Sequence, residues 1–292
     1  MTDQALWCFR PGQPVILLGR KHREFYTVLA EGGKTSVRGR IVQHDDIIGQ
    51  PQGCRVRALS GDQFEVIAAT LQKHALHMPR HAQIIYPKDI AMLLLHGDVY
   101  PGLSVIEGGF GSGALSTGIL RAIGDSGRLT TYELRPEPVI RAQRNVETLL
   151  GPRPNHTVRI DNIYDGIEEC GVDRVILDVP EPWQVIEPAA KALRPGGIFA
   201  AYVPTAIQLH RLGIALQRSW AFTAVESQET LVRPWFVNAK SCRPEQRMIG
   251  HTGFLMFAHR RAVRTRPMRR ALAEDAVGDE GRDKDRGRNT EE

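Results

Sequence analysis

The chain has 292 residues, enough to bury a substantial core and to favour two domains over one. Its hydrophobic content of 42% and charged content of 24% are ordinary for a globular protein, which argues against a fibrous or fully disordered chain. No apolar run reaches the length of a membrane span, and the opening sequence lacks a charged start followed by an apolar stretch. We therefore expect neither a membrane segment nor a signal peptide. The net charge of +5 weakly favours a polyanionic partner, but many proteins that bind no polyanion have a similar charge.

The cysteines indicate a reducing compartment. The chain has four, at Cys8, Cys54, Cys170 and Cys242, and no two of them form a C-x-x-C pair. This scatter is typical of reduced thiols in the cytoplasm, and a disulfide between some of them stays an alternative.

Residues 1–72 are predicted to form a small β domain. Short apolar runs alternate with glycines, at residues 14–18, 25–29, 54–59 and 64–69. Gly61-Asp62, between the last two runs, is typical of a hairpin turn. Basic residues give the domain one charged face: Arg20, Lys21, His22, Arg23, Lys34, Arg38 and Arg40. That face is either a solvated surface or a contact for nucleic acid.

A histidine-rich linker is expected over residues 72–86. Its histidines, His74, His77 and His81, are not accompanied by a cluster of carboxylates or thiolates. Pro79 interrupts any helix between them, because proline lacks the N–H that a helix interior needs. We therefore expect no metal site here.

Residues 103–122 are interpreted as a strand, a glycine turn and a helix. A short apolar run ends at Glu107, the sequence GGFGSG follows, and apolar residues then recur at helical spacing. A glycine-lined turn lets a ligand approach bare backbone, and the helix N-terminus offers unpaired N–H groups. Gly109, Gly111 and Ala114 fit a dinucleotide-binding turn, whereas the acidic residue before the turn and its additional glycine favour S-adenosylmethionine. A purely structural turn is the third interpretation.

Strands and helices alternate from residue 103 onward, which predicts a mostly parallel sheet with helices on both faces. The strand at 129–132 is followed by Glu133, whose carboxylate either accepts both ribose hydroxyls of an adenosine or lies on the surface. The next strand, at 158–160, is followed by Asp161, which either accepts a hydrogen bond from an adenine amino group or caps a turn. The helix expected between them, at 136–150, carries on its apolar side Ile140, Ala142 and Val146.

A stiff acidic loop follows the strand predicted at 173–178. Its sequence, DVPEPW, begins at Asp178 and ends at Trp183, and each proline fixes its own φ and restricts the residue before it. A doubly wound fold places reacting groups on such loops, at the carboxyl ends of central strands. Methyltransferases that act on exocyclic amines typically have N-P-P-aromatic here. The carboxylate of Asp178 instead suits a reaction that creates positive charge, such as methylation of N1 of adenine, where it orients the base and stabilises the charge.

The rest of the chain completes the alternation. Further elements are predicted as helices at 186–193 and 206–219, a strand at 198–203, and an antiparallel pair at 222–226 and 254–257. Residues 230–248, with Trp235 and Phe236, are either a partner or RNA surface or a plain structured loop. From Arg264 the composition turns to mixed charge with few apolar residues, which predicts a disordered tail. The expected divisions are therefore 1–72, 73–262 and 263–292.

Six separated blocks of sequence point to one family. They are QIIYPKD (83–89), EGGFGSGAL (107–115), YELR (132–135), LDVPEPW (177–183), AYVPTAIQ (201–208) and GHTGFL (250–255). In this order, within a match that covers roughly residues 10–260, they resemble the bacterial and archaeal tRNA (adenine-58-N1) methyltransferases. Six blocks in the right order are far less expected by chance than any one of them.

The resemblance implies an α/β fold: a Rossmann-like S-adenosylmethionine methyltransferase sheet with a small N-terminal β domain, usually in a homotetramer. The implied cofactor residues are Gly109, Gly111, Ser112, Gly113, Ala114, Leu115, Glu133, Asp161 and Asp178. Of these, 112–115 lie on the methionine part, Glu133 on the ribose, Asp161 on the adenine and Asp178 at the methyl acceptor. The substrate is expected to contact Tyr86, Trp183 and Tyr202, of which the two tyrosines line the target-base pocket or alternatively pack in the core. The chain departs from the family at Phe110, where small residues are common, and at Pro138, where histidine is frequent.

The implied activity is methylation of N1 of adenosine 58 in the T loop of tRNA, which gives m1A, in the cytoplasm. That adenosine is paired and stacked, so it must be extruded into a pocket surrounded by basic surface. Basic candidates besides the β-domain arginines are Arg233, Lys240, Arg243 and Arg247. Three alternatives stay open: a methyltransferase of a protein or small molecule, a non-catalytic tRNA-binding subunit and, more distantly, a dehydrogenase.

Overall fold

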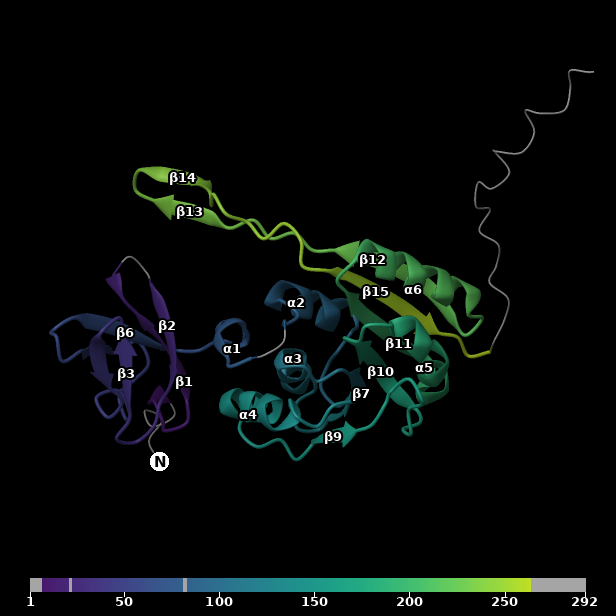
Figure 1. Ribbon diagram of the computed structural model, residues 1–292, viewed down its shortest axis with the longest axis horizontal. Helices are drawn as coiled ribbons and strands as arrows, with labels where there is room; N and C mark the ends of the chain where they lie inside the picture. Colours follow the sequence, from purple (N-terminus) through teal and green to yellow (C-terminus); the bar gives the residue numbers. More distant parts are fainter. Residues whose placement is uncertain (1–6, 21–22, 81–82, 264–292) are drawn as a thin grey trace, which may run out of the picture.

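The computed structural model describes residues 7–20, 23–80 and 83–263. It has two parts, an N-terminal β region and a larger sheet covered by helices (Figure 1). Residues 264–292, which hold nearly all of the predicted tail, lie outside the described residues, as do Lys21, His22 and His81.

The N-terminal part is an antiparallel sheet with a hairpin packed on it. Its four strands, in the order β2-β1-β6-β5, are β1 (Pro14–Leu18), β2 (Glu24–Val28), β5 (Arg55–Arg57) and β6 (Gln63–Ala68). The hairpin of β3 (Lys34–Val37) and β4 (Arg40–Gln43) was not predicted from the sequence. It adds Val37 and Val42 to the buried cluster of Val15, Leu17 and Val66, so the region has its own apolar core.

The first part of the linker predicted over residues 72–86 lies in a packed helix. Helix α1 (Leu71–His77) begins after Thr70, whose hydroxyl accepts a hydrogen bond from the Lys73 N–H at 3.3 Å. The helix ends before Pro79, consistent with the inability of proline to continue it. His74 is 1% exposed in this helix and contacts both parts of the chain.

The larger part is a seven-stranded, mostly parallel sheet. Its strand order is β12-β15-β11-β10-β7-β8-β9. The strands are β7 (Ser104–Gly108), β8 (Arg128–Glu133), β9 (His156–Ile160), β10 (Val172–Leu177), β11 (Leu193–Val203), β12 (Phe222–Glu229) and β15 (Phe254–Arg260). β15 runs antiparallel to both of its neighbours, and the strands from β11 to β9 are parallel. This arrangement confirms the predicted fold class.

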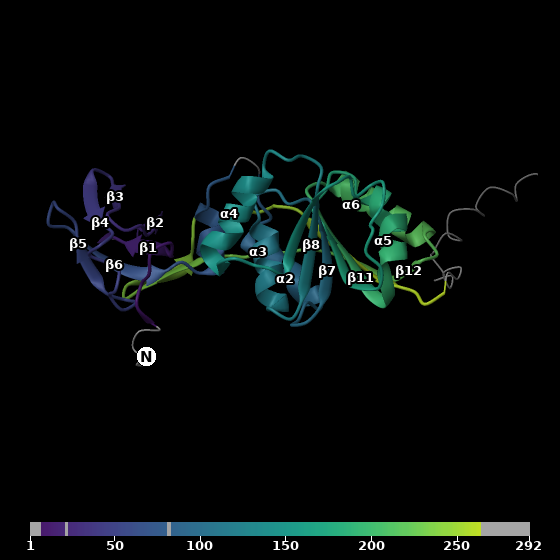
Figure 2. The same ribbon diagram turned by 90° about the horizontal axis from the view of Figure 1, so that it is seen from below.

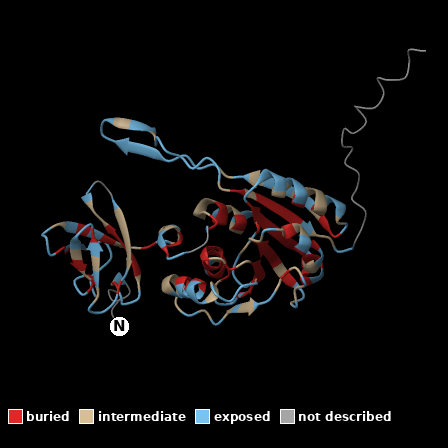
Figure 3. Ribbon diagram, in the orientation of Figure 1, coloured by how far each residue is buried: buried red, intermediate tan, exposed pale blue. Residues whose placement is uncertain are grey.

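Helices cover both faces of this sheet (Figure 2). One face carries α2 (Pro87–His96), α3 (Ala114–Ile123) and α4 (Val139–Leu150), and the other carries the short η3 (Pro182–Val185), α5 (Ile186–Ala192) and α6 (Ala206–Arg218). The buried residues of the two faces form separate clusters, which appear as red strands and inner helix surfaces in Figure 3. Ile140, expected on the apolar side of its helix, is 66% exposed in the first turn of α4, so that detail is wrong. Among the described helices none is long and apolar enough to cross a membrane.

Residues 230–248 contain a hairpin that stands away from the sheet. Strands β13 (Trp235–Asn238) and β14 (Ser241–Pro244) pair with each other and with no other described strand. Figure 1 shows them at the end of two extended connections that leave β12 and β15, and Figure 3 shows the segment exposed along nearly its whole length. We call residues 230–250 the arm.

The order of the strands reverses between β7 and β10. The chain passes from β7 to β8 and β9 on one side, then returns to β10 on the other, and doubly wound folds bind their ligands beyond the carboxyl ends of the strands at such a reversal. There the Asp178 N–H donates a 2.8 Å hydrogen bond to the carbonyl oxygen of Gly108. A Cβ on Gly109 would lie 2.3 Å from the carbonyl oxygen of Asp178, so only glycine fits at this crossing.

Replacing Gly109 with alanine is expected to destabilise the fold far more than replacing Gly111. Both glycines have positive φ, but a Cβ at 111 would meet nothing within 4 Å. We expect the free energy of unfolding to fall by about 3–5 kcal/mol in Gly109→Ala and by about 1–2 kcal/mol in Gly111→Ala. Urea denaturation followed by circular dichroism measures both values. Equal losses in the two variants would contradict the steric explanation.

Candidate functional site

The glycine turn between β7 and α3 packs against α4 at Gly113 and faces open space at Gly111. Gly109, Gly111 and Gly113 have φ of 90°, 54° and 84°, in the left-handed region that favours glycine. A Cβ on Gly113 would lie 2.8 Å from the Ala142 carbonyl oxygen, so the turn is pressed against α4 there. Gly111 faces open space instead, so a ligand would approach the turn at this residue.

The N-terminus of α3 adds hydrogen-bond donors beside the turn. No side chain caps this helix, whose N-cap residue is Gly113. Ala114 and Leu115 pack their side chains into the core, each 4% exposed, which leaves their backbone N–H groups as the polar part of the first turn. An uncapped helix N-terminus attracts negatively charged groups such as carboxylates.

Two acidic residues lie at the carboxyl ends of the neighbouring strands β8 and β9: Glu133 is the last residue of β8, and Asp161 follows β9. Glu133 is 8% exposed, and its carboxylate accepts hydrogen bonds from the N–H groups of Phe110 at 3.1 Å and Arg135 at 3.0 Å. The carboxylate is therefore tied to the glycine turn and keeps one acceptor position free on each oxygen. Asp161 is exposed, and its N–H donates to the Glu133 carbonyl oxygen at 3.1 Å. The structure thus brings both predicted residues to the same edge as the turn.

Glu107 lies beneath the turn and is fully buried. One carboxylate oxygen accepts hydrogen bonds from Ser116 at 2.6 Å and Thr131 at 2.7 Å, and the other, Oε1, has no partner among the described residues. Burial raises the pKa of Glu107 to about 8 despite these two hydrogen bonds, and the charges of Asp178 and Glu133 add to the rise. The protonated form therefore predominates at neutral pH.

Asp178 stands at the start of the acidic loop, directly across from Gly109. Its carboxyl forms no hydrogen bond or ion pair with any described residue. Although part of the residue reaches the surface, protein surrounds the carboxyl closely enough that burial raises its pKa to about 6. A partly desolvated carboxylate without a partner is an acceptor ready for a ligand.

One predicted aromatic residue, Tyr202, interacts electrostatically with this carboxyl. Burial raises the pKa of Tyr202 to about 12, and the charges of Asp89, Asp178 and Tyr86 raise it further. The hydroxyl of Tyr202 donates to the carbonyl oxygen of Thr252, so its ring, on β11, is held in one orientation.

A polar network that the sequence analysis did not assign is joined to Tyr202 through Thr252. Lys88 pairs with the fully buried Asp89 at 2.7 Å, and the Thr252 hydroxyl lies 2.6 Å from the Lys88 ammonium and 2.7 Å from the Asp89 carboxylate. The only sequence signal was the presence of these residues in two of the six blocks. The structure shows why those blocks belong together, although 164 residues separate Lys88 from Thr252.

Trp183 is not joined to the rest of the site by any described contact. It lies in η3, packs against the apolar cluster under α5 and α6, and has the Arg211 guanidinium 4.4 Å above its ring. Its predicted contact with the substrate therefore stays a prediction.

Asn145 on α4 was also missed, although it holds the glycine turn in place. Its side-chain amide donates 2.9 Å hydrogen bonds to the carbonyl oxygens of Ser112 and Pro79, and the side chain is buried. The Asn145 carbonyl oxygen accepts from His74 Nε2 at 2.8 Å. No group of three or more potential metal ligands occurs in the described segments, and His74 is a structural residue there.

Two family models match the chain. The model described as tRNA methyltransferase complex GCD14 subunit matches residues 63–243, and the model described as TrmI-like N-terminal matches residues 8–56. Between them they cover most of both parts of the structure.

Individual proteins agree with these matches. The chain is 34% identical to the tRNA (adenine(58)-N(1))-methyltransferase TrmI of Thermus thermophilus, over 86% of this chain and 97% of that protein. It superposes with a TM-score of 0.84 on a SAM-dependent O-methyltransferase from Thermotoga maritima, at 30% identity over 91% of this chain and 99% of that one. The corresponding TM-score is 0.75 for the tRNA (m1A58) methyltransferase TrmI from Aquifex aeolicus, at 29% identity over 87% and 98%. With two family models and a relative that matches along nearly its full length, the resemblance seen in the six blocks is confirmed: this chain belongs to the tRNA (adenine-58-N1) methyltransferase family.

Proposed function

We propose that this protein transfers the methyl group of S-adenosylmethionine to N1 of adenosine 58 in the T loop of tRNA. The observation that carries this proposal is the unpartnered carboxyl of Asp178, fixed against the glycine turn at the point where the strand order reverses. Related proteins from bacteria and an archaeon are named for methylation of the same adenosine.

The residues around the turn fit this cofactor. The uncapped N-terminus of α3 suits the carboxylate of its methionine part, and the open side of Gly111 leaves room for it. Glu133 keeps acceptor positions for the ribose hydroxyls, and Asp161 is exposed at the same edge for the adenine amino group. The remaining residues of the turn, Ser112 to Leu115, contribute backbone rather than side chains.

The role of Asp178 follows from the charge that the reaction moves. S-adenosylmethionine supplies a methyl group bound to a cationic sulfur. The in-plane lone pair of adenine N1 attacks that methyl, the S–C electron pair returns to sulfur, and the positive charge passes to the purine. In its ionised form Asp178 accepts a hydrogen bond from the N6 amino group, which orients N1, and its charge stabilises the purine cation in a partly desolvated site.

The base has to be extruded to reach this carboxyl. We assign Tyr86 and Tyr202 to its pocket, because the charges of both Asp178 and Tyr86 act on Tyr202 and the Tyr202 hydroxyl is held by Thr252. Trp183, at the end of the same loop, is assigned a contact with a neighbouring part of the substrate.

A second acceptor chemistry has one observation in its favour. The Thermotoga maritima structure is described as an O-methyltransferase. Methylation of a hydroxyl requires a base to remove its proton, whereas N1 of adenine attacks with a free lone pair and needs none. The raised pKa of Asp178, about 6, would allow it to act as such a base. Identification of the methylated product therefore distinguishes methylation of N1 from methylation of a hydroxyl.

Mass spectrometry of nucleosides provides the test. The protein is incubated with S-adenosylmethionine and an unmodified tRNA transcript, and the digest is compared with that of a transcript carrying guanosine at position 58. We expect m1A in the first sample only. A ribose-methylated nucleoside, methylation of a peptide instead of tRNA, or no product would each contradict the proposal.

Asp178→Ala is expected to lower kcat by roughly 10²–10³-fold, while affinity for S-adenosylmethionine measured by calorimetry stays largely unchanged. Asp178→Asn should recover part of the rate, because an amide still accepts the N6 hydrogen bond.

In the wild type, kcat/KM should fall as the pH drops through about 6, where the carboxylate becomes protonated, and this fall should be absent in Asp178→Asn. Glu181→Gln, in the same loop, serves as a control. An active Asp178→Ala variant would remove Asp178 from the reacting groups.

The protein is further proposed to assemble into a homotetramer in the cytoplasm. Support for assembly comes from the arm, where large apolar side chains are exposed: Leu231, Val232, Trp235, Phe236, Val237, Met248 and Ile249. A contiguous apolar segment of this kind marks a surface that another chain covers. The cytoplasm is proposed because the substrate is tRNA.

Val237→Lys is expected to reduce the molar mass measured by light scattering after gel filtration. Val237 is 68% exposed at the outer end of the arm, so a lysine there leaves the fold intact but places a charge in the proposed contact. Lys240→Gln, in the turn of the same hairpin, is the matched control. A monomeric wild type, or a variant with an unchanged mass, would contradict assembly through the arm.

A further inference from the structure

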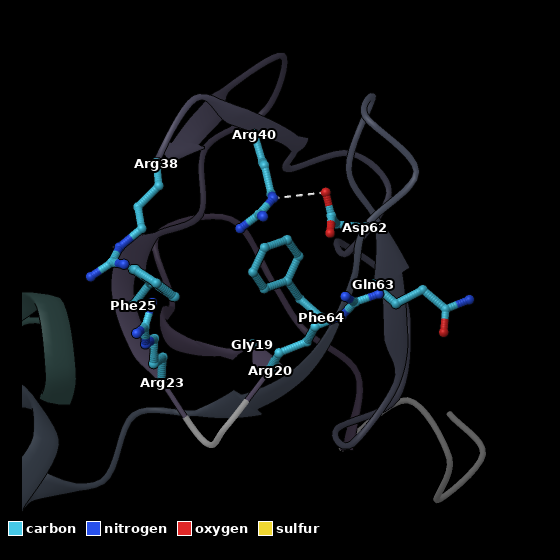
Figure 4. A pocket seen from close by; sticks show the side chains of 9 residues that line it. All are labelled: Gly19, Arg20, Arg23, Phe25, Arg38, Arg40, Asp62, Gln63 and Phe64. Carbon is cyan, nitrogen blue, oxygen red and sulfur yellow. Dashed lines mark ion pairs between the residues drawn. The ribbon is translucent and has the colours of Figure 1, made fainter.

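A basic hollow lies at one end of the N-terminal β region. It is lined by residues at the end of β1 and just before β2, in and beside the β3–β4 turn, and at the start of β6. They enclose a cavity of about 220 Å³, several times the volume of a water molecule. It is lined by Gly19, Arg20, Arg23, Phe25, Arg38, Arg40, Asp62, Gln63 and Phe64 (Figure 4).

The arginines leave this hollow with an excess of positive charge. Arg40 pairs with Asp62 at 2.7 Å, but Arg23 and Arg38 form no ion pair with the described residues. In Figure 4 these two gather at the end of the hollow beside Phe25, away from the Arg40–Asp62 pair. Four guanidinium groups around one carboxylate form a site for an anion with more than one negative charge.

The backbone presents one of these arginines at a conformational cost. Arg38 has a φ of 52° and is followed by Gly39 at 81°, in the two-residue turn between β3 and β4. Asparagine, aspartate or glycine is preferred at such a position, because a larger side chain is strained there. An arginine kept in a strained turn suggests that its side chain has a role outside the fold.

Aromatic rings form the floor of the hollow. Phe25 and Phe64 pack edge to face with their centroids 6.3 Å apart, and both rings lie against Gly19, where a Cβ would be 3.2 Å from Phe64 and 3.5 Å from Phe25. Phe64 is only 3% exposed, whereas Phe25 is partly exposed. Guanidinium groups above an apolar floor match a sugar–phosphate chain, which has anionic oxygens on one side and apolar sugar and base surfaces on the other.

We propose that this hollow binds the sugar–phosphate backbone of the tRNA substrate, away from the adenosine that is methylated. The inference rests on the proposed function for the identity of the nucleic acid. Because phosphate contacts carry no base information, the hollow sets the position of the tRNA rather than its sequence specificity.

Hydrogen bonds connect the hollow to the glycine turn. Tyr26, next to Phe25 on β2, contacts His74 Nδ1 at 2.9 Å, and His74 Nε2 contacts the Asn145 carbonyl oxygen at 2.8 Å. Burial lowers the pKa of His74, so the ring is neutral: Nε2–H donates to the carbonyl oxygen and Nδ1 accepts from the Tyr26 hydroxyl. Asn145 then donates to the Ser112 carbonyl oxygen at 2.9 Å. These hydrogen bonds keep a tRNA that is bound in the hollow at a fixed distance from the glycine turn.

The test measures tRNA affinity as a function of salt. Filter binding with an unmodified transcript, from about 50 to 200 mM salt, compares the wild type with Arg23→Gln, Arg38→Asn and the double variant. Each lost phosphate contact should weaken binding roughly five- to eightfold near 0.1 M salt and reduce the salt slope by about 0.7–0.9. Asparagine tolerates a positive φ, so Arg38→Asn should be at least as stable to urea as the wild type, which separates affinity from folding.

Asp62→Asn changes the charge in the opposite direction. It removes the only carboxylate among the lining residues and releases Arg40, so tRNA affinity should rise. Arg121→Gln, on the exposed side of α3, is the control for loss of one positive charge elsewhere. If the hollow variants bind tRNA as Arg121→Gln does while the wild type forms m1A, this inference is overturned and the proposed function stands. If their affinities shift as described but the wild type forms no m1A, the hollow is supported and the proposed function fails.

Discussion

The site depends on one backbone contact, where the chain after β7 crosses the chain after β10. The Asp178 N–H reaches the Gly108 carbonyl oxygen, and the Asp178 carbonyl oxygen occupies the space that a side chain on Gly109 would need. A single glycine therefore sets how close the acidic loop comes to the glycine turn. The prolines that stiffen the loop keep the carboxyl of Asp178 there, whereas Gly111, two residues further on, leaves the turn open to a ligand. Close packing on one side of the turn and open space on the other are both needed for a transfer reaction.

Three carboxyls near this crossing make the site suited to a cation. Burial raises the pKa of Glu107 and of Asp178, and the charges of Asp178 and Glu133 raise that of Glu107 further. A bound positive charge acts in the opposite direction: it lowers these pKa values and stabilises the ionised forms. In the proposed reaction, the sulfonium donor and the methylated purine are both cations. The three carboxylates repel one another when they are ionised and no ligand is bound, but they attract the cationic donor before transfer and the cationic purine after it. A nicotinamide dinucleotide would bring two phosphates into the same field, which explains physically why the dinucleotide interpretation of the turn fails.

The sequence predicted what depends on neighbouring residues and missed what depends on distant ones. The strand, turn and helix at 103–122 follow from local pattern, and so does the antiparallel pair of β12 and β15. The β3–β4 hairpin has only short apolar alternation, and its stability comes from Val37 and Val42 packing on strands elsewhere in the region. Helix α1 was hidden by its short length of 7 residues, by its two histidines and by Pro79, which stands beyond its end. The Lys88–Asp89–Thr252 network and the support from Asn145 join segments that only the folded chain brings together, so no periodicity could reveal them.

His74 shows most clearly how distance changes the meaning of a residue. In the sequence it is one of a histidine group for which metal binding was considered and rejected, without another role in view. In the structure it is a neutral, buried imidazole that uses both nitrogens, one toward the β region and one toward the helix that supports the glycine turn. Loss of either hydrogen bond would leave a buried polar group unsatisfied, at a cost of about 1–3 kcal/mol. Moving the two parts relative to each other would break one of these hydrogen bonds, and this cost fixes their relative position. A tRNA bound at the basic surface of the β region is therefore held in a defined position relative to the glycine turn of the other part.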